Sequence, residues 1–284
     1  MTLTISAPPH RVMGVTVNKI MWGKVLALVP VSLVAIYFFG LPAFGILFAS
    51  VITAVATEAG IQKIFNQEST IADGHAVLMG LMLALILPYD VPIWIVVVGS
   101  FFAIAIVKHA YGGIGSYMFN PVLVSWVFLN LSWTSIMTTK STPHIVALTD
   151  LILENGAGFL VGVSPIALIG GVVLILMRYV EWRVPLSYFV TTLLLVFLLK
   201  DDLSYVITGA YLFGVLFIAT DSVTMPITKK GRIIYGIVCG VLTVLYGYYA
   251  SYVTGTFYAL MLANCIVPYI ELKTLPKPFG GDAE

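Results

Sequence analysis

The sequence predicts an all-α polytopic membrane protein with about ten transmembrane helices. Hydrophobic residues make up 60% of the chain and charged residues only 10%, whereas soluble domains carry about 25% charged residues. Several apolar runs approach the roughly 20 residues that an α-helix needs to cross hydrocarbon. When ten spans are threaded through a bilayer, the lysines and arginines fall almost entirely on one side.

The spans are read from apolar runs separated by short polar loops, and the third, fifth and sixth are short for a full crossing. The ten segments are approximately Met21–Gly40, Leu41–Ala59, His75–Leu87, Val91–His109, Pro121–Met137, Pro165–Tyr179, Val184–Leu199, Leu203–Thr220, Ile233–Ala250 and Thr256–Glu271. We expect one integral membrane domain over residues 1–284, because no soluble domain interrupts the chain.

Charge placement orients these spans. With a cytoplasmic N-terminus, only Lys140 and Lys200 lie outside, and all other basic residues lie inside: Arg11, Lys19, Lys24, Lys63, Lys108, Arg178, Arg183, Lys229, Lys230, Arg232, Lys273 and Lys277. The positive-inside rule therefore predicts that both termini are cytoplasmic and that the loop at about 138–162 is extracytoplasmic.

A weak internal repeat at an offset of 135 residues pairs Gly74 with Gly209, Ala84 with Ala219, and Tyr111-Gly112 with Tyr246-Gly247. Five spans per half is an odd number, so two such repeats, at about 21–137 and 165–271, would be inverted in the membrane, as in many transporter folds. Chance identity in an apolar sequence is the alternative.

Several functions are not indicated. A net charge of +1 gives no reason to expect a nucleic-acid partner. No phosphate-binding glycine motif of a dinucleotide or P-loop site is present. Cys239 and Cys265 lie in apolar runs, which favours buried hydrophobic roles over metal or redox chemistry. The tryptophans Trp94, Trp126, Trp133 and Trp182 fit interfacial belts better than a cofactor site.

The loop from Tyr111 to Asn120 is the first candidate site. Its three glycines permit positive φ or close approach to a ligand. Asn120 before Pro121 suits a helix N-terminus, where free N–H groups bind anionic or carbonyl atoms. A plain cap and a ligand contact both remain open for Asn120.

Ionisable residues near span ends form a second set of candidates, because charges at membrane depth are costly and often functional. Asp73 begins the third span and Asp221 follows the eighth. Helix capping is the favoured role for Asp73, and packing for His75. Lys108 is predicted to be an interfacial anchor.

Glu58 lies near the end of the second span, and we expect its side chain to extend towards water. On composition alone, the segment Thr138–Pro143 is a solvated turn.

A family resemblance changes how that turn is interpreted. The chain resembles the RnfD/NqrB family of membrane flavoprotein subunits from about Lys24 to Phe279. The resemblance rests on Asp-Gly-His-Ala-Val-Leu-Met-Gly-Leu-Met-Leu-Ala at 73–84, Lys-His-Ala-Tyr-Gly-Gly-Ile-Gly at 108–115, Phe-Asn-Pro at 119–121, Glu-Trp-Arg-Val-Pro-Leu at 181–186, Ala-Thr-Asp-Ser-Val-Thr at 219–224, Gly-Arg-Ile-Ile-Tyr-Gly at 231–236, and Leu-Ala-Asn-Cys-Ile-Val-Pro at 262–268. The short length is more similar to RnfD than to NqrB.

The resemblance implies two flavins. Thr139-Lys140-Ser141-Thr142 matches the family's attachment signal, so FMN would be joined through its phosphate to the Thr142 hydroxyl by a separate flavin transferase. The sequence departs from the family pattern in having Lys140 where a small residue is usual and in lacking an upstream acidic residue. A second, non-covalent flavin, riboflavin, would contact Asn120 and, at the position of a second asparagine in NqrB-type chains, Tyr117.

The resemblance also implies a function and a location. The chain would be an electron-transfer subunit of an ion-motive oxidoreductase in a prokaryotic cell membrane, with no complete active site of its own. Electrons from reduced ferredoxin would move towards NAD or a membrane carrier, coupled to Na⁺ or H⁺ translocation. The partners would be membrane lipid and RnfA-, RnfB-, RnfC-, RnfE- and RnfG-like subunits. The alternative from another class is a flavin-free inverted-repeat channel or secondary transporter, with Asp73 and Asp221 lining the path.

Overall fold

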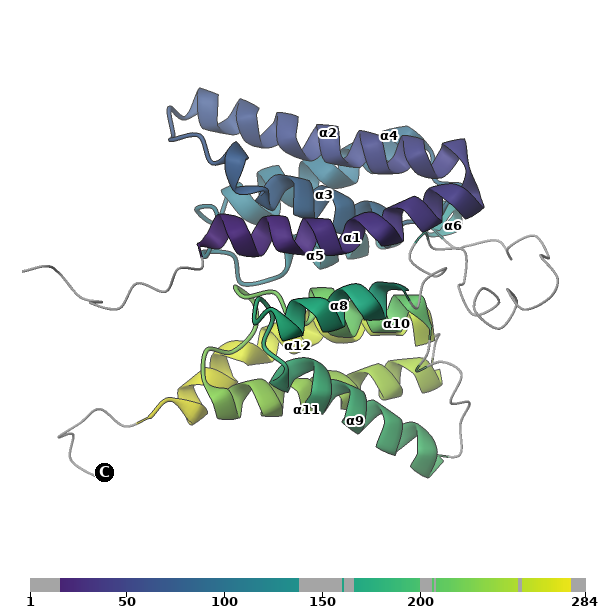
Figure 1. The fold of residues 1–284 in the computed structure, drawn as a ribbon, viewed down its shortest axis with the longest axis vertical. Coiled ribbons are helices and arrows are strands. Elements are labelled where there is room, and N and C mark those ends of the chain that lie inside the picture. The colour runs from purple at the N-terminus through teal and green to yellow at the C-terminus, as the bar shows by residue number, and fades with distance from the viewer. Residues whose placement is uncertain are drawn as a thin grey trace, which may run out of the picture.

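The computed structural model describes residues 16–137, 160, 166–199, 206, 208–249 and 252–276. The regular elements within these ranges are helices, and each of the ten predicted spans lies wholly or largely on them. Figure 1 shows two groups of roughly parallel and antiparallel helices, α1–α6 and α8–α12, lying side by side. The prediction of an all-α polytopic membrane protein is confirmed.

The first group contains two long helices followed by shorter ones. In chain order its elements are α1 (Val17–Phe39), α2 (Leu41–Ile64), the 3₁₀ turn η1 (Ile71–Asp73), α3 (His75–Leu85), α4 (Ile93–Phe101), its π-helical continuation η2 (Phe102–His109), α5 (Pro121–Ser132) and α6 (Thr134–Met137). Thr16 caps α1 and Asn120 caps α5, each with its side-chain oxygen, and Pro121 occupies the first position of α5.

In the second group the longest helices come last. The group consists of α8 (Ile166–Leu176), α9 (Arg183–Leu199), α10 (Gly209–Phe213) with its π-helical continuation η5 (Gly214–Ile218), α11 (Lys229–Tyr249) and α12 (Tyr252–Thr274). Helices α1, α2, α11 and most of α12 are long and apolar enough to cross a membrane. Apolar side chains such as Leu26, Phe44 and Phe197 project outward from the helices, as expected for surfaces that face lipid.

The third α-helix of each group, α3 in the first and α10 with η5 in the second, is too short to cross a bilayer. An 11-residue helix such as α3 is only about 17 Å long, against a hydrocarbon thickness of about 30 Å. Nearly all residues of α3, and all residues of α10 and η5, are buried. The matched pairs Gly74 with Gly209 and Ala84 with Ala219 lie at the two ends of these elements. The weak sequence repeat therefore marks the two short core helices.

The two groups run in opposite directions. In Figure 1, α1 starts at the end of the bundle where α12 finishes, whereas α8 starts at the opposite end and runs back. Ala27 of α1 lies against Gly170 of α8, and Gly23 lies against Tyr179, which fits an antiparallel pair. Contacts between the groups are made mainly by α1 with α8 and by α5 with α12. This arrangement agrees with two inverted five-span repeats; the repeat limits and the loop at 138–162 stay predictions.

Glycines allow close helix crossings in both groups. A Cβ on Gly80 of α3 would lie 2.9 Å from the Val51 Cα of α2, and the Ser50 hydroxyl donates to the Gly80 carbonyl at 2.7 Å. A Cβ on Gly236 of α11 would lie 2.8 Å from the Val184 carbonyl oxygen of α9. Backbone atoms cannot move aside as side chains can, so these crossings require glycine.

We expect Gly236→Ala to lower the stability of the protein by about 1–3 kcal/mol, because the added methyl group overpacks the crossing of α9 and α11. Gly60→Ala on α2 is the control, since nothing lies within 4 Å of its added Cβ. Thermal unfolding in detergent measures both. Equal melting temperatures for the two variants would contradict the close crossing.

Candidate functional site

The loop between η2 and α5 has a backbone that only glycine adopts easily. Gly112, Gly113 and Gly115 have φ values of 105°, 93° and 93°. The loop ends at Asn120, whose Oδ1 accepts a hydrogen bond from the Val122 N–H at 3.0 Å. The capping role predicted for Asn120 is confirmed, and the ligand role stays a prediction.

Asp221 from the second helix group reaches this loop. Its Oδ2 accepts hydrogen bonds from the Asn120 Nδ2 at 3.2 Å and from the Tyr117 hydroxyl at 3.4 Å. It also accepts one from the Thr224 hydroxyl at 3.4 Å. Asp221, Tyr117 and Asn120 are all buried, although they are attached to loops or a helix cap. The carboxylate thus joins the two groups.

Two further side chains complete this set. The Lys24 ammonium of α1 donates to the Thr220 carbonyl at 3.3 Å, next to Asp221. The His75 Nε2, at the start of α3, lies 3.2 Å from the Tyr117 hydroxyl. Burial is the main cause, and the charge of Asp221 the second, that raises the pKa of Tyr117 well above its usual value. The phenol therefore stays protonated and able to donate.

We call these residues the junction cluster: Lys24, His75, Tyr117, Asn120, Asp221 and Thr224.

A second buried charged network lies within the first group. The Lys108 ammonium is 2.6 Å from the Glu58 Oε2, and both side chains are almost completely buried. The Gln62 amide and the Thr70 hydroxyl donate to the Glu58 Oε1 at 3.2 and 2.9 Å. The expectation that Glu58 extends to water and Lys108 anchors at the interface is therefore wrong. Each charge satisfies the other, so both can remain inside.

Other sequence expectations have mixed outcomes. Gly74 is the N-cap residue of α3, but the Asp73 carboxylate satisfies the first helical N–H by accepting a hydrogen bond from His75 at 2.8 Å. His75 is packed, as predicted. Trp126 is wholly buried, so its place in an interfacial belt is wrong. Cys239 is a buried free thiol as expected, whereas Cys265 is exposed on the outside of the bundle.

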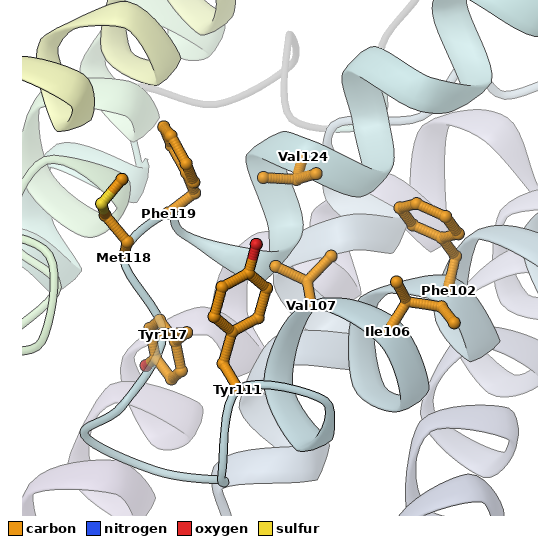
Figure 2. Close-up of a pocket in the computed structure, with 8 residues that line it drawn as sticks. All are labelled: Phe102, Ile106, Val107, Tyr111, Tyr117, Met118, Phe119 and Val124. Carbon is orange, nitrogen blue, oxygen red and sulfur yellow. The ribbon is translucent and has the colours of Figure 1, made fainter.

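A small cavity adjoins the Tyr117 side of the loop. It measures about 210 Å³ and is lined by Phe102, Ile106, Val107, Tyr111, Tyr117, Met118, Phe119 and Val124. Figure 2 shows these side chains around it, with contributions from η2, the glycine-containing loop and the first turn of α5. Pockets that enclose a whole drug-sized ligand measure about 300–1,000 Å³, so this one would take only part of such a molecule.

This cavity could hold the ring system of a flavin but not the whole molecule. Aromatic and aliphatic walls suit a flat ring system, which gains contact area and favourable ring packing there. Tyr117 lines the cavity, while its hydroxyl is hydrogen-bonded to Asp221 within the junction cluster. Asn120 follows Phe119, another lining residue, and its amide is bonded to Asp221. Thr142, the third predicted flavin residue, lies outside the described residues.

Sequence reasoning misses how these residues come together. Lys24 could have been found from the sequence as a candidate site residue, because it is a cation inside an apolar span. By charge placement, it counts only as a charge that orients the chain in the membrane. The position of Asp221 at a span end does not reveal its partners, because residues 101 and 104 positions away cannot be paired by local pattern.

Comparison with known proteins identifies the family. A family model described as "NQR2, RnfD, RnfE family" matches residues 4–280. The chain belongs to the NQR2, RnfD, RnfE family. The match covers the whole helical region, including the junction cluster and the cavity.

Curated relatives are similar from end to end. The chain is 52% identical over 284 residues to the D subunit of the "Ion-translocating oxidoreductase complex" of Methanosarcina acetivorans, covering 99% of each chain. It is 37% identical to the D subunit of the "Na(+)-translocating ferredoxin:NAD(+) oxidoreductase complex" of Acetobacterium woodii, covering 99% of this chain and 96% of that one. Identity to the D subunit of the "Proton-translocating ferredoxin:NAD(+) oxidoreductase complex" of Clostridium ljungdahlii is 33%, covering 98% and 96%.

The buried pair in the first group gives a direct prediction. Lys108→Met leaves the Glu58 charge buried without a cation, and we expect it to destabilise the protein by about 3–5 kcal/mol. Adding Glu58→Gln removes that charge and should recover most of the loss. Thermal unfolding of the single and double variants measures this, with Lys63→Met on the exposed side of α2 as the control. A double variant no more stable than Lys108→Met would contradict the pairing.

Proposed function

We propose that this chain is the D subunit of an ion-translocating electron-transfer complex. The observation that carries the proposal is full-length similarity to three proteins named as D subunits of such complexes, with identities of 52%, 37% and 33%. The complex would pass electrons from reduced ferredoxin towards NAD or a membrane carrier and move Na⁺ or H⁺. RnfA-, RnfB-, RnfC-, RnfE- and RnfG-like subunits would be its partners, supplying the dinucleotide chemistry for which this sequence has no motif.

The proposal assigns FMN to Thr142. The supporting observation is the segment Thr139-Lys140-Ser141-Thr142, where Pro143 biases the preceding residue towards extended backbone. An extended hydroxyl-bearing residue suits access by the flavin transferase. The attached group would supply redox chemistry, and the protein would supply its position and charge environment.

A second flavin, riboflavin, is proposed at the loop that holds Tyr117 and Asn120. The aromatic cavity beside Tyr117 supports the placement of a flat ring. In this arrangement the chain's own groups would pack against the ring, exclude water from one side, and hold the neighbouring polar atoms in one orientation. The junction cluster would lie behind the cavity wall.

Orientation in the membrane follows from charge. The described lysines and arginines lie near the helix ends at which α1 begins and α12 finishes: Lys19, Lys24, Lys63, Lys108, Arg178, Arg183, Lys229, Lys230, Arg232 and Lys273. By the positive-inside rule, this end faces the cytoplasm. Met137, the last residue of α6, lies at the other end, which supports an extracytoplasmic position for Thr142.

The covalent flavin has a simple test. Co-expression of the chain with a flavin transferase should give a denatured gel band with flavin fluorescence, because a phosphoester bond survives denaturation. Thr142→Val should abolish the fluorescence, and Thr149→Val in the same segment should retain it. A dark wild-type band refutes attachment. A purified protein without any flavin absorbance favours the channel or transporter alternative.

The orientation has an independent test. In a variant lacking Cys239 and Cys265, a cysteine at Ser141 should react with a membrane-impermeant maleimide in intact cells. A cysteine at Glu68, exposed in the loop after α2, should react only after the membrane is opened. The reverse labelling pattern would overturn the proposed topology.

A further inference from the structure

We infer that Asp221 is a positioning residue for the flavin-contacting loop, and that Asp221 and Lys24 together set the charge at that site. The inference rests on the second flavin of the proposed function. It extends that proposal by assigning roles to two residues outside the loop, one of them in the other helix group.

The first argument is the fixed orientation of the Asn120 amide. Its Oδ1 accepts from the Val122 N–H at 3.0 Å, and its Nδ2 donates to Asp221 at 3.2 Å. The cap requires the oxygen on one side, and the carboxylate requires the nitrogen on the other. Rotation of the amide would break both hydrogen bonds, so only one orientation satisfies them.

The second argument is that Tyr117 both lines the cavity and is hydrogen-bonded through its hydroxyl. Tyr117 is one of the residues that line the cavity, and its hydroxyl lies between the Asp221 Oδ2 at 3.4 Å and the His75 Nε2 at 3.2 Å. Figure 2 shows Tyr117 among the residues that line the cavity. A side chain held at its far end presents the same ring surface to whatever enters, which is the preorganisation a binding site needs.

The third argument is charge. Asp221 and Lys24 lie together in a buried region, and Lys24 is bonded to the carbonyl of Thr220, the residue before Asp221. Their charges offset one another, so the region behind the cavity is close to neutral. Removing either charge leaves the other uncompensated in a medium of low dielectric constant, where its field reaches further than in water.

The two charges should therefore act on the flavin with opposite signs. A nearby cation favours the reduced form of a redox group, because reduction adds negative charge, and a nearby anion disfavours it. Asp221→Asn keeps the shape and leaves Lys24, so the midpoint potential of the bound riboflavin should rise. Lys24→Met leaves Asp221, so the potential should fall.

The experiment is a redox titration of the purified full-length chain carrying Thr142→Val, so that only the non-covalent flavin absorbs. Asp221→Asn, Lys24→Met and Lys24→Arg are each added to this background. Lys24→Arg retains the charge and should keep the parent potential. Thr243→Val is the control, since it removes a buried hydrogen bond to Tyr188 on α9, away from the junction cluster.

Opposite shifts for Asp221→Asn and Lys24→Met, with no shift for Lys24→Arg, support the inference. Shifts in the same direction, or none, overturn it, because a merely structural role gives no reason for opposite signs. If Asp221→Asn does not fold, the comparison of Lys24→Met with Lys24→Arg decides alone. A parent protein without any bound flavin refutes the second-flavin proposal and this inference together, whereas a flavin with unmoved potentials refutes only the inference.

Discussion

The architecture depends on two helices that are too short to cross the membrane. A helix of 10 or 11 residues ends within the hydrocarbon thickness. Other parts of the protein must surround its ends, because its terminal N–H and C=O groups need hydrogen-bond partners. The remaining helices enclose α3 and α10 with η5 for this reason. The loops that follow or precede the short helices are then brought inside as well. Asp221, directly after η5, and His75, at the start of α3, are buried as a consequence.

Burial of these loops explains the two charged networks. Glu58 and Lys108 satisfy one another within the first group at 2.6 Å. Asp221 is satisfied across the groups by Asn120 and Tyr117, with Lys24 nearby. A buried ionic group is costly unless paired, so each network ties its elements together more by the penalty of separation than by net attraction. The network within the first group holds α2 to η2, and the junction cluster holds one group to the other.

The spans and the fold class can be predicted from the sequence because they depend on local composition. All ten apolar segments lie wholly or largely on helices. The third span is predicted to be short, as α3 is, whereas the eighth is predicted over Leu203–Thr220 and its described helix covers Gly209–Ile218. Sequence reasoning fails where the outcome depends on partners distant in the chain. Glu58 is expected to reach water because a carboxylate at a span end usually does so. Its burial follows only from Lys108, 50 residues away, which no local pattern reveals.

The same distinction applies to the site. Asn120 is found as a cap from Asn-Pro alone, but its second bond, to Asp221, requires the two groups to be packed together. The proposed flavins then fall at the two ends of one stretch of chain. Asn120 precedes α5, Thr142 comes after α6 in the sequence, and the 17 residues from Pro121 to Met137 span up to about 25 Å. A charge pair at one end, Asp221 with Lys24, would then act mainly on the nearer flavin, because its field weakens with distance. The potentials of the two flavins could in this way be tuned separately by one chain.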